Sequence, residues 1–213
     1  SVPQHTIENN QTTITIEEES APLKVFGNHN LLNIHAAWLV CRQLGISAAV
    51  FVKAIASFTG AAKRLELLAQ ADGTIVYRDF AHAPSKVKAT IEAVKAQYPD
   101  KKLFALLELH TYSSLNEAFM NEYNGVMADA DVAVVFYSSH ALQLKRLPLL
   151  QQAVVEKGFA KEGLDVLTTK EALQTFLKAH TYENSIVLFM SSGTYDGFDL
   201  EGFSKKITGM AVK

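Results

Sequence analysis

Apolar and polar positions alternate over a short stretch near the N-terminus. Residues 12–17 (TTITIE) have the period of two that is typical of a half-exposed strand. Residues 22–26 (PLKVF) follow and can pair with them across an acidic turn that contains a proline. We predict an antiparallel hairpin here, with no strand before it.

Two stretches with the apolar spacing of a helix follow the hairpin. The first covers residues 29–44 and the second covers residues 47–58, where Ser47 is a candidate N-cap. The apolar positions of the first helix are Leu32, Ala36, Leu39 and Val40. Because the hairpin and the two helices form a small unit, we expect one domain over residues 1–59 and a second over residues 60–213.

The second domain has a pattern of alternating strands and helices. Residues 63–80 predict two strands joined through Asp72 and Gly73, which tolerate the positive φ angles of a tight turn. Further strands are expected over residues 102–109, 131–137, 164–167 and 185–190. Helices are expected over residues 85–98, 114–126, 147–157 and 169–179. Several strands are continuous apolar runs, which predicts an α/β sandwich with helices on both faces of a parallel sheet.

Composition limits the classes of function. The chain has 213 residues, 48% of them apolar, which is enough for a sizeable core. Its 20 basic residues nearly balance its 22 acidic residues, so we expect neither a nucleic acid nor a membrane as a partner. The single cysteine, Cys41, cannot form an internal disulfide, and no apolar run approaches the ~20 residues of a membrane span. We expect a globular protein of the cytoplasm.

Polar side chains follow most of the predicted strands of the second domain. Ligands bind beyond the carboxyl ends of the strands in an open parallel sheet, so these residues are candidates for a binding site. They are Asp79, His82, His110, Thr111, Ser113, Ser138, Ser139, His140, Ser191, Ser192 and Gly193. No histidine pair has the spacing of a helical zinc site, and no G-x-S-x-G motif is present. The pattern therefore favours neither a zinc site nor a serine hydrolase.

Several of these polar residues have a purely structural alternative. Ser114 with Glu117, and Thr168 with Glu171, have the spacing of a capping box and are expected to cap helices. Asp79 can accept hydrogen bonds from the backbone at the start of the next helix without a role in catalysis.

Three motifs, in the same order as in a known family, narrow the interpretation. They are GNHNLLNIHAA at 27–37, FTGAAKRLE at 58–66 and DFAHAP at 79–84. Together they resemble the Mur ligases, cytoplasmic ATP-dependent enzymes that join amino acids or peptides to UDP-N-acetylmuramate. The resemblance implies a Rossmann-like C-terminal domain with a mostly parallel six-stranded sheet. It also implies that the hairpin and helices before this domain are the end of the family's central ATP-binding domain.

The resemblance implies a nucleotide site in the first two motifs. Asn30 and Asn33 match the residues that contact adenine, which suits an amide because it both donates and accepts hydrogen bonds, and His29 opens the same turn. Arg64 matches the second of two basic residues that reach the ATP phosphates, and Lys63 occupies the first position.

The third motif completes this implied site. Asp79 matches an acid near the nucleotide and metal region, and His82 lies in the same loop. The implied catalytic residues are Arg64, Asp79 and His82, and the implied cofactors are ATP and Mg²⁺, without a metal ligand assigned in this chain. The junction would complete the ATP site when the C-terminal domain closes.

The resemblance also implies segments that this sequence lacks. No glycine is followed by lysine, so the family's phosphate-binding loop is missing, and so is the domain that holds the UDP-sugar. We expect a fragment of a longer ligase that is inactive alone and depends on the missing N-terminal and central segments. The expected small-molecule partners are UDP-N-acetylmuramate and either a muramyl peptide or L-alanine.

Two further segments indicate the incoming substrate. LELHTYSSL at 107–115 resembles the alanine-adding branch, whereas MSSGTYDGF at 190–198 resembles the branch that attaches L-alanyl-γ-D-glutamyl-meso-diaminopimelate. We favour the tripeptide, with L-alanine as the alternative and a non-catalytic nucleotide- or peptide-binding domain as the alternative of another class. The implied substrate-binding residues are His110, Thr111, Ser113, Ser191, Ser192 and Gly193, with Tyr112 and Tyr195 as apolar walls.

Overall fold

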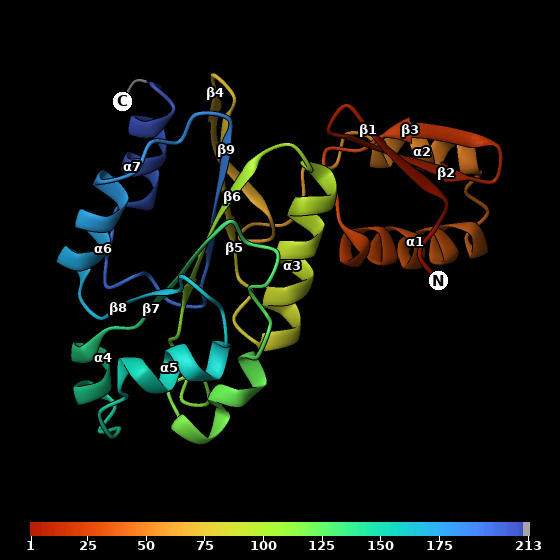
Figure 1. Ribbon diagram of the computed structural model, residues 1–213. Coiled ribbons are helices and arrows are strands. Elements are labelled where there is room, and N and C mark those ends of the chain that lie inside the picture. The colour runs from red at the N-terminus through yellow and green to blue at the C-terminus, as the bar shows by residue number, and fades with distance from the viewer. Residues whose placement is uncertain (211–213) are drawn as a thin grey trace. The chain divides into compact units, whose positions relative to one another are not determined.

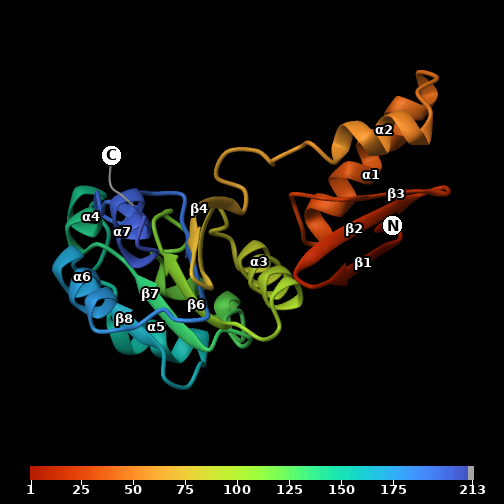
Figure 2. The ribbon, with the colours of Figure 1, turned by 90° about the horizontal axis from the view of Figure 1, so that it is seen from above.

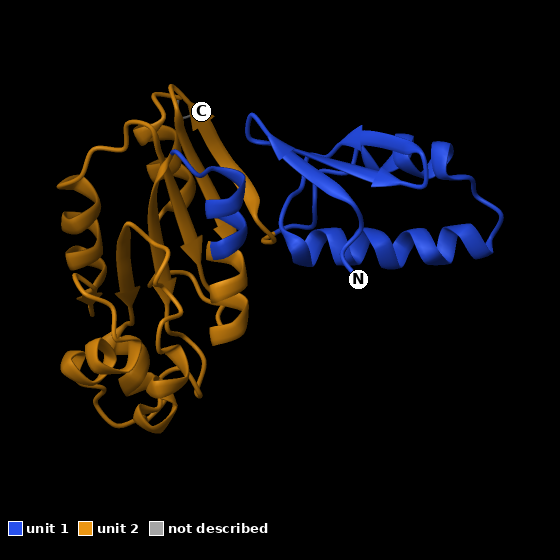
Figure 3. Cartoon of the chain, turned by 45° about the vertical axis from the view of Figure 1, so that its right-hand side comes forward, with its two compact units in different colours: residues 1–62, 92–100 blue, residues 63–91, 101–213 orange. Residues whose placement is uncertain are grey.

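The computed structural model describes residues 1–210 and divides into two compact units. Unit 1 comprises residues 1–62 and 92–100, and unit 2 comprises residues 63–91 and 101–213 (Figure 3). Each unit has its own cluster of buried apolar side chains. The assignment of residues 1–59 and 60–213 to two ligase domains stays a prediction.

Unit 1 contains a three-stranded antiparallel sheet in the order β1-β2-β3. Its strands are β1 (His5–Glu8), β2 (Gln11–Ile16) and β3 (Glu19–Pro22). The prediction of a strand over residues 22–26 was wrong, and so was the absence of a strand before the hairpin. Asn9 and Asn10, with φ of 51° and 60°, form the tight turn between β1 and β2, because asparagine tolerates this conformation. The strand β1 is mostly exposed and polar, so its sequence lacks the apolar alternation from which a strand is predicted.

The two predicted helices of unit 1 form as α1 (Asn28–Gln43) and α2 (Ala48–Ile55). The apolar positions named for this helix from the sequence are not its buried face. The buried residues are Leu31, Ile34 and Trp38, whereas Leu32, Leu39 and Val40 are exposed. The apolar residues of this helix lie on most of its sides, so their spacing alone does not predict which side is buried. Ser47 occupies the N-cap position of α2, but its side chain makes no cap hydrogen bond.

Unit 2 is built on a six-stranded sheet in the order β4-β5-β9-β6-β7-β8. Its strands are β4 (Glu66–Ala71), β5 (Thr74–Asp79), β6 (Lys102–Glu108), β7 (Val132–Phe136), β8 (Asp165–Leu167) and β9 (Ser185–Met190). Only the β4–β5 pair is antiparallel, and Asp72 and Gly73 form its turn with φ of 48° and 82°. The prediction of an α/β domain with a mostly parallel six-stranded sheet is confirmed.

Helices cover both faces of this sheet (Figure 1). The helix α3 lies on one side, and α6 and α7 lie on the other, where they pack on Phe104, Val187 and Phe189. Figure 2 shows the same layers from above. The helical elements are α3 (Pro84–Gln97), η1 (Glu117–Tyr123), α4 (Ser139–Leu144), α5 (Gln152–Phe159), α6 (Lys170–Lys178) and α7 (Leu200–Ile207).

Several helix predictions need correction. The helix expected over residues 114–126 is a shorter 3₁₀ helix, the one expected over 147–157 is α5, and α4 and α7 were not predicted. Both capping boxes were wrong. Asn116 caps η1 by accepting from the Ala118 N–H, and Thr169 caps α6 by accepting from the Ala172 N–H. The Thr168 prediction missed the cap by one residue, a usual error at helix ends.

No helix within residues 1–210 is long and apolar enough to cross a membrane.

Candidate functional site

The carboxyl ends of β5, β9 and β6 meet at one edge of the unit 2 sheet. These strands are adjacent and parallel, and Met190 at the end of β9 is in register with Asp79 on β5 and Leu107 on β6. The loops that follow the three strands are therefore neighbours. We call this the carboxyl edge of the sheet.

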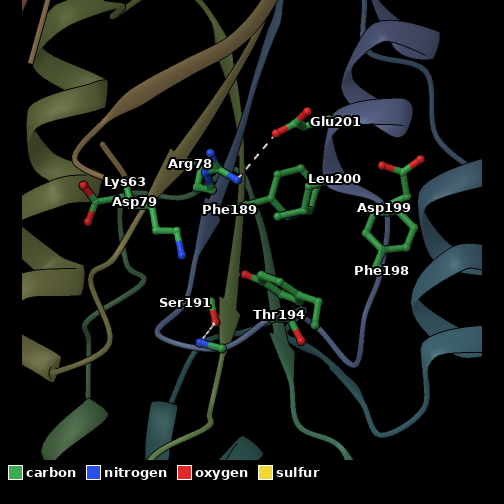
Figure 4. Close-up of a pocket in the computed structure, with 12 residues that line it drawn as sticks. Lys63, Arg78, Asp79, Phe189, Ser191, Thr194, Phe198, Asp199, Leu200 and Glu201 are labelled. Carbon is green, nitrogen blue, oxygen red and sulfur yellow. Dashed lines mark hydrogen bonds and ion pairs between the residues drawn. The ribbon is translucent and has the colours of Figure 1, made fainter. Parts of the chain in front are cut away.

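A cavity of about 260 Å³ opens at the carboxyl edge (Figure 4). Three residues predicted for the site line it, namely Asp79, Ser191 and Gly193. Its other lining residues are Lys63, Arg78, Phe189, Thr194, Tyr195, Phe198, Asp199, Leu200 and Glu201. One residue of the predicted nucleotide site and two of the predicted substrate site therefore line the same cavity, and the other predicted residues do not line it.

Asp79 ends β5 and is buried, with 3% of its surface exposed. Its Oδ2 accepts from the Leu65 N–H at 2.7 Å, and its Oδ1 accepts from the Ala81 N–H at 2.7 Å. The Thr90 hydroxyl donates to Oδ1 at 3.5 Å. Neither backbone donor belongs to the helix that follows, so Asp79 fixes the turns at both sides of the strand end and does not cap α3.

Arg64 and His82 both contact one aromatic ring, that of Phe80. The Arg64 guanidinium lies 5.5 Å from the centroid of Phe80, and the His82 ring meets Phe80 edge to face at 5.3 Å. His82 Nδ1 is 2.9 Å from the Phe80 carbonyl oxygen. Arg64 is exposed and has no acidic partner within residues 1–210, so its charge is accessible to an anionic ligand.

The predicted adenine-binding residues belong to unit 1. His29, Asn30 and Asn33 lie in the first turns of α1, which begins after Gly27, whose φ is 86°. The Asn30 amide donates to the Phe26 carbonyl oxygen at 2.8 Å, and Asn33 is exposed. A nucleotide site that joins these residues to Arg64 and Asp79 stays a prediction.

Glu108 is a residue of the carboxyl edge that the sequence patterns did not select. It ends β6, only 2% of its surface is exposed, and its Oε2 accepts from the Tyr195 N–H at 2.8 Å and from the Ser191 hydroxyl. The Gly193 N–H donates to the same hydroxyl at 2.6 Å. The hydrogen bonds of Glu108 thus hold the loop after β9 at the end of β6. An acid inside the run LFALLEL was the available signal, because a buried carboxylate needs partners.

His110 lies against this carboxylate. Its Nδ1 is 3.6 Å from Glu108 Oε1, which is within ion-pair range and longer than a hydrogen bond. A Cβ atom on Gly193 would lie 2.7 Å from His110 Nδ1 and 2.8 Å from Glu108 Oε2. The glycine therefore permits the imidazole to pack directly on the backbone of the loop after β9.

The remaining predicted substrate residues have mixed surroundings. The hydroxyls of Thr111, Ser113 and Ser114 bond to one another within their loop. Ser192 Oγ is buried and has no hydrogen-bond partner within residues 1–210. Tyr112 is exposed, with Lys145 Nζ 4.8 Å from its ring centroid, and does not line the cavity.

Tyr195 is part of the core and also lines the cavity, so its role as a wall along the peptide stays a prediction. It is fully buried, and its hydroxyl is within 2.9 Å of the carbonyl oxygens of Leu106 and Met190. Burial, together with the charge of Glu108, raises the pKa of the phenol well above its ordinary value.

Sequence reasoning also did not select Arg78, because it considered the residues at and after the end of each strand, whereas Arg78 is the second-last residue of β5. Its guanidinium binds Glu66 at 3.0 Å, and Glu201 lies 4.0 Å away across the cavity (Figure 4). Burial of the Glu66 carboxyl opposes its charged form, but the Lys63 N–H and the Arg78 guanidinium hold its pKa below the ordinary value. With Lys63, Arg78 gives the cavity two cationic side chains.

Comparisons with known proteins agree with the motifs. The profile of the family described as "Mur ligase, glutamate ligase domain" matches residues 63–193. The UDP-N-acetylmuramate–L-alanine ligase of Gloeobacter violaceus is 31% identical over 172 residues, which cover 80% of this chain and 37% of that protein. The enzyme of the same name from Carboxydothermus hydrogenoformans is 28% identical over 184 residues, covering 84% of this chain and 39% of that protein.

Solved structures show the same fold. The UDP-N-acetylmuramate–alanine ligase of Thermotoga maritima has a TM-score of 0.68 at 18% identity, with 97% of this chain and 44% of that chain covered. A murein peptide ligase of Psychrobacter arcticus has a TM-score of 0.60 at 20% identity, with 98% of this chain and 44% of that chain covered. The chain thus spans less than half the length of each of these relatives.

Proposed function

Because the chain belongs to the Mur ligase family, we propose that it is the C-terminal part of a longer ATP-dependent ligase. The ligase joins L-alanyl-γ-D-glutamyl-meso-diaminopimelate to UDP-N-acetylmuramate in peptidoglycan recycling, in the cytoplasm. The muramyl carboxylate is first phosphorylated, and the amine of the incoming peptide then displaces phosphate to form the amide bond.

ATP takes part in the first step of the proposed reaction, the phosphorylation of the muramyl carboxylate. The family uses ATP and Mg²⁺. Arg64 is the residue of unit 2 best suited to the ATP phosphates, because its exposed guanidinium can make two parallel hydrogen bonds to an anion. We propose that Asn30 and Asn33 of unit 1 contact adenine, and that His82 contributes beside Arg64 through the shared Phe80 ring.

Mg²⁺ fits the described residues less well. Residues 1–210 hold no group of three or more His, Cys, Asp or Glu side chains that could bind a metal ion. Asp79, the acid that the resemblance places near the nucleotide and metal, already accepts two short hydrogen bonds from backbone N–H groups. We propose that Asp79 keeps the loop before α3 in place and that the Mg²⁺ ligands come from another part of the polypeptide.

The incoming peptide occupies the cavity at the carboxyl edge. The observation that carries this assignment is the charge of the cavity lining, in which Lys63 and Arg78 are cationic and Asp79, Asp199 and Glu201 are acidic. The cations can bind the carboxylates of a peptide, and the acids can bind its amino groups. The cavity volume of about 260 Å³ has room for more than one small amino acid. Ser192 follows the lining residue Ser191, and its buried hydroxyl has no partner within residues 1–210. A peptide with several charged groups suits these features.

L-Alanine is the second candidate for the incoming substrate. Curated relatives at 26% to 37% identity carry the name UDP-N-acetylmuramate–L-alanine ligase, and His110 belongs to the segment that resembles this branch.

A competition experiment separates the two candidates. The full-length polypeptide that contains this chain is given UDP-N-acetylmuramate, ATP, and equal amounts of the tripeptide and L-alanine. We expect the tripeptide to be incorporated in preference, and a preference for L-alanine would assign the protein to the alanine-adding branch. Ser192→Val should weaken tripeptide use without loss of stability, whereas Thr181→Val, at an exposed threonine that does not line the cavity, serves as the control.

A non-catalytic binding domain is the alternative of another class. Under the proposed function, the 213-residue chain alone should release no phosphate from ATP, since it has no G-K-containing phosphate loop, whereas the full-length protein should. A full-length protein without nucleotide turnover would favour the binding domain.

A further inference from the structure

Glu108 and His110 form a pair that the amide-forming step can use. The carboxylate is buried at the end of β6, and the imidazole lies two residues further on, with 38% of its side chain exposed at the carboxyl edge. On the basis of the proposed function, we propose that His110 accepts the proton that the incoming amine loses when it attacks the acyl phosphate. Glu108 is the positioning residue that orients the imidazole.

The two oxygens of Glu108 have different partners. Oε2 receives the Tyr195 N–H and the Ser191 hydroxyl, whereas Oε1 faces His110 Nδ1 at 3.6 Å. A carboxylate beside Nδ1 favours the imidazole tautomer with its proton on that nitrogen. Nε2 is then unprotonated, and no group within residues 1–210 forms a hydrogen bond with it. The distance can shorten when a ligand closes the site, as catalytic hydrogen bonds commonly do.

Gly193 fixes the position of the imidazole from the other side. The ring lies so near to the Gly193 backbone that a Cβ atom there would be 2.7 Å from both Cγ and Nδ1 of His110. Gly193 also lines the cavity proposed for the peptide. The imidazole is thus held between Glu108 and a cavity wall, next to the proposed position of the incoming substrate.

The proposed proton transfer balances the reaction. The amine nitrogen forms a bond with the acyl carbon, and the carbon–oxygen bond to phosphate breaks, so that phosphate leaves with that electron pair. The proton released from nitrogen passes to Nε2 of His110, and the resulting imidazolium faces the buried carboxylate of Glu108, which stabilises its charge. The imidazolium then loses the proton to solvent. Formation of the acyl phosphate needs no such base.

The test separates the two steps in the full-length protein. Hydroxylamine is largely unprotonated at neutral pH and traps the acyl phosphate as a hydroxamate without help from a base. We expect His110→Ala to slow amide formation by about 100-fold or more, the usual size of a general-base contribution, and to leave hydroxamate formation within twofold of wild type. Added imidazole should restore part of the amide formation. His5→Ala, at a histidine of β1 that has no predicted role in the site, is the control and should leave both rates unchanged.

Glu108→Gln tests the positioning role. We expect kcat for amide formation to fall about tenfold with KM unchanged, and nitrogen NMR of the 213-residue chain should show loss of the Nδ1-protonated tautomer of His110. The NMR measurement does not depend on activity and also shows that the variant is folded.

Two results would overturn the inference while the proposed function stands. In one, amide formation by His110→Ala stays within threefold of wild type. In the other, His110→Ala lowers amide and hydroxamate formation equally, which is the result of a binding role. A wild-type protein that forms neither product with ATP would refute the proposed function itself, and with it this inference.

Discussion

The loops after β5 and after β6 begin with the same feature, a buried carboxylate at the carboxyl end of a parallel strand. Asp79 is 3% exposed and Glu108 is 2% exposed. Their partners differ. Both Asp79 oxygens accept from backbone N–H groups of neighbouring turns, whereas Glu108 uses one oxygen for the loop after β9 and directs the other to an imidazole. The same position in the sheet therefore holds one acid whose two oxygens are bound by backbone donors and one acid that faces an imidazole, and we propose a structural role for the first and a positioning role for the second.

The first way to break this comparison is to remove Asp79. Asp79→Ala leaves the N–H groups of Leu65 and Ala81 without their acceptors, and hydrogen bonds to a charged group contribute about 1.5–3 kcal/mol each. We expect the free energy of unfolding to fall by about 3 kcal/mol or more, measured by urea denaturation. Asp129→Ala, at an exposed acid, is the control and should change it by less than about 0.5 kcal/mol. Equal stabilities of the two variants would show that Asp79 is not a structural acid.

Gly193→Ala tests how closely the loop after β9 fits Glu108 and His110. The added methyl group would meet His110 Nδ1 and Glu108 Oε2 at less than 3 Å, so either the imidazole or the loop must move. Overpacking of this kind costs about 1–3 kcal/mol, which urea denaturation detects. In the full-length protein, the same variant should lower amide formation more than hydroxamate formation. Wild-type stability and activity of this variant would contradict the close packing.

Glu66→Gln gives the smallest expected effect and depends on pH. The pKa of the Glu66 carboxyl is held below its ordinary value in the folded chain, so the charged form stabilises the fold above the unfolded value of about 4.3. That contribution is lost as the pH falls through the folded pKa. Because both partners of the ion pair are partly exposed, we expect a cost of less than about 1 kcal/mol at pH 7. The difference between wild type and variant should shrink in denaturation curves as the pH falls through the folded pKa of Glu66, and a difference that does not shrink on acidification would exclude the ion pair as its cause.

The sequence by itself determined the elements with a strong local signal. The continuous apolar runs became β6, β7 and β9, and the Asp72-Gly73 turn joined β4 to β5, because these features depend on neighbouring residues alone. The strand ends also indicated where Asp79, His110 and Ser191 would lie, since parallel strands place their carboxyl ends at one edge. The three sequence motifs alone indicated the family that the profile over residues 63–193 matches.

Only the tertiary structure decided which of these residues meet. The apolar spacing of α1 fits more than one side of the helix, and packing in unit 1 chose Leu31, Ile34 and Trp38. Glu108 stood inside an apolar run, where an isolated acid has no local partner, and its partners Ser191 and Tyr195 lie more than 80 residues away in the chain. Contacts of this kind depend on the strand order, which places β9 between β5 and β6, and no local pattern in the sequence encodes that order.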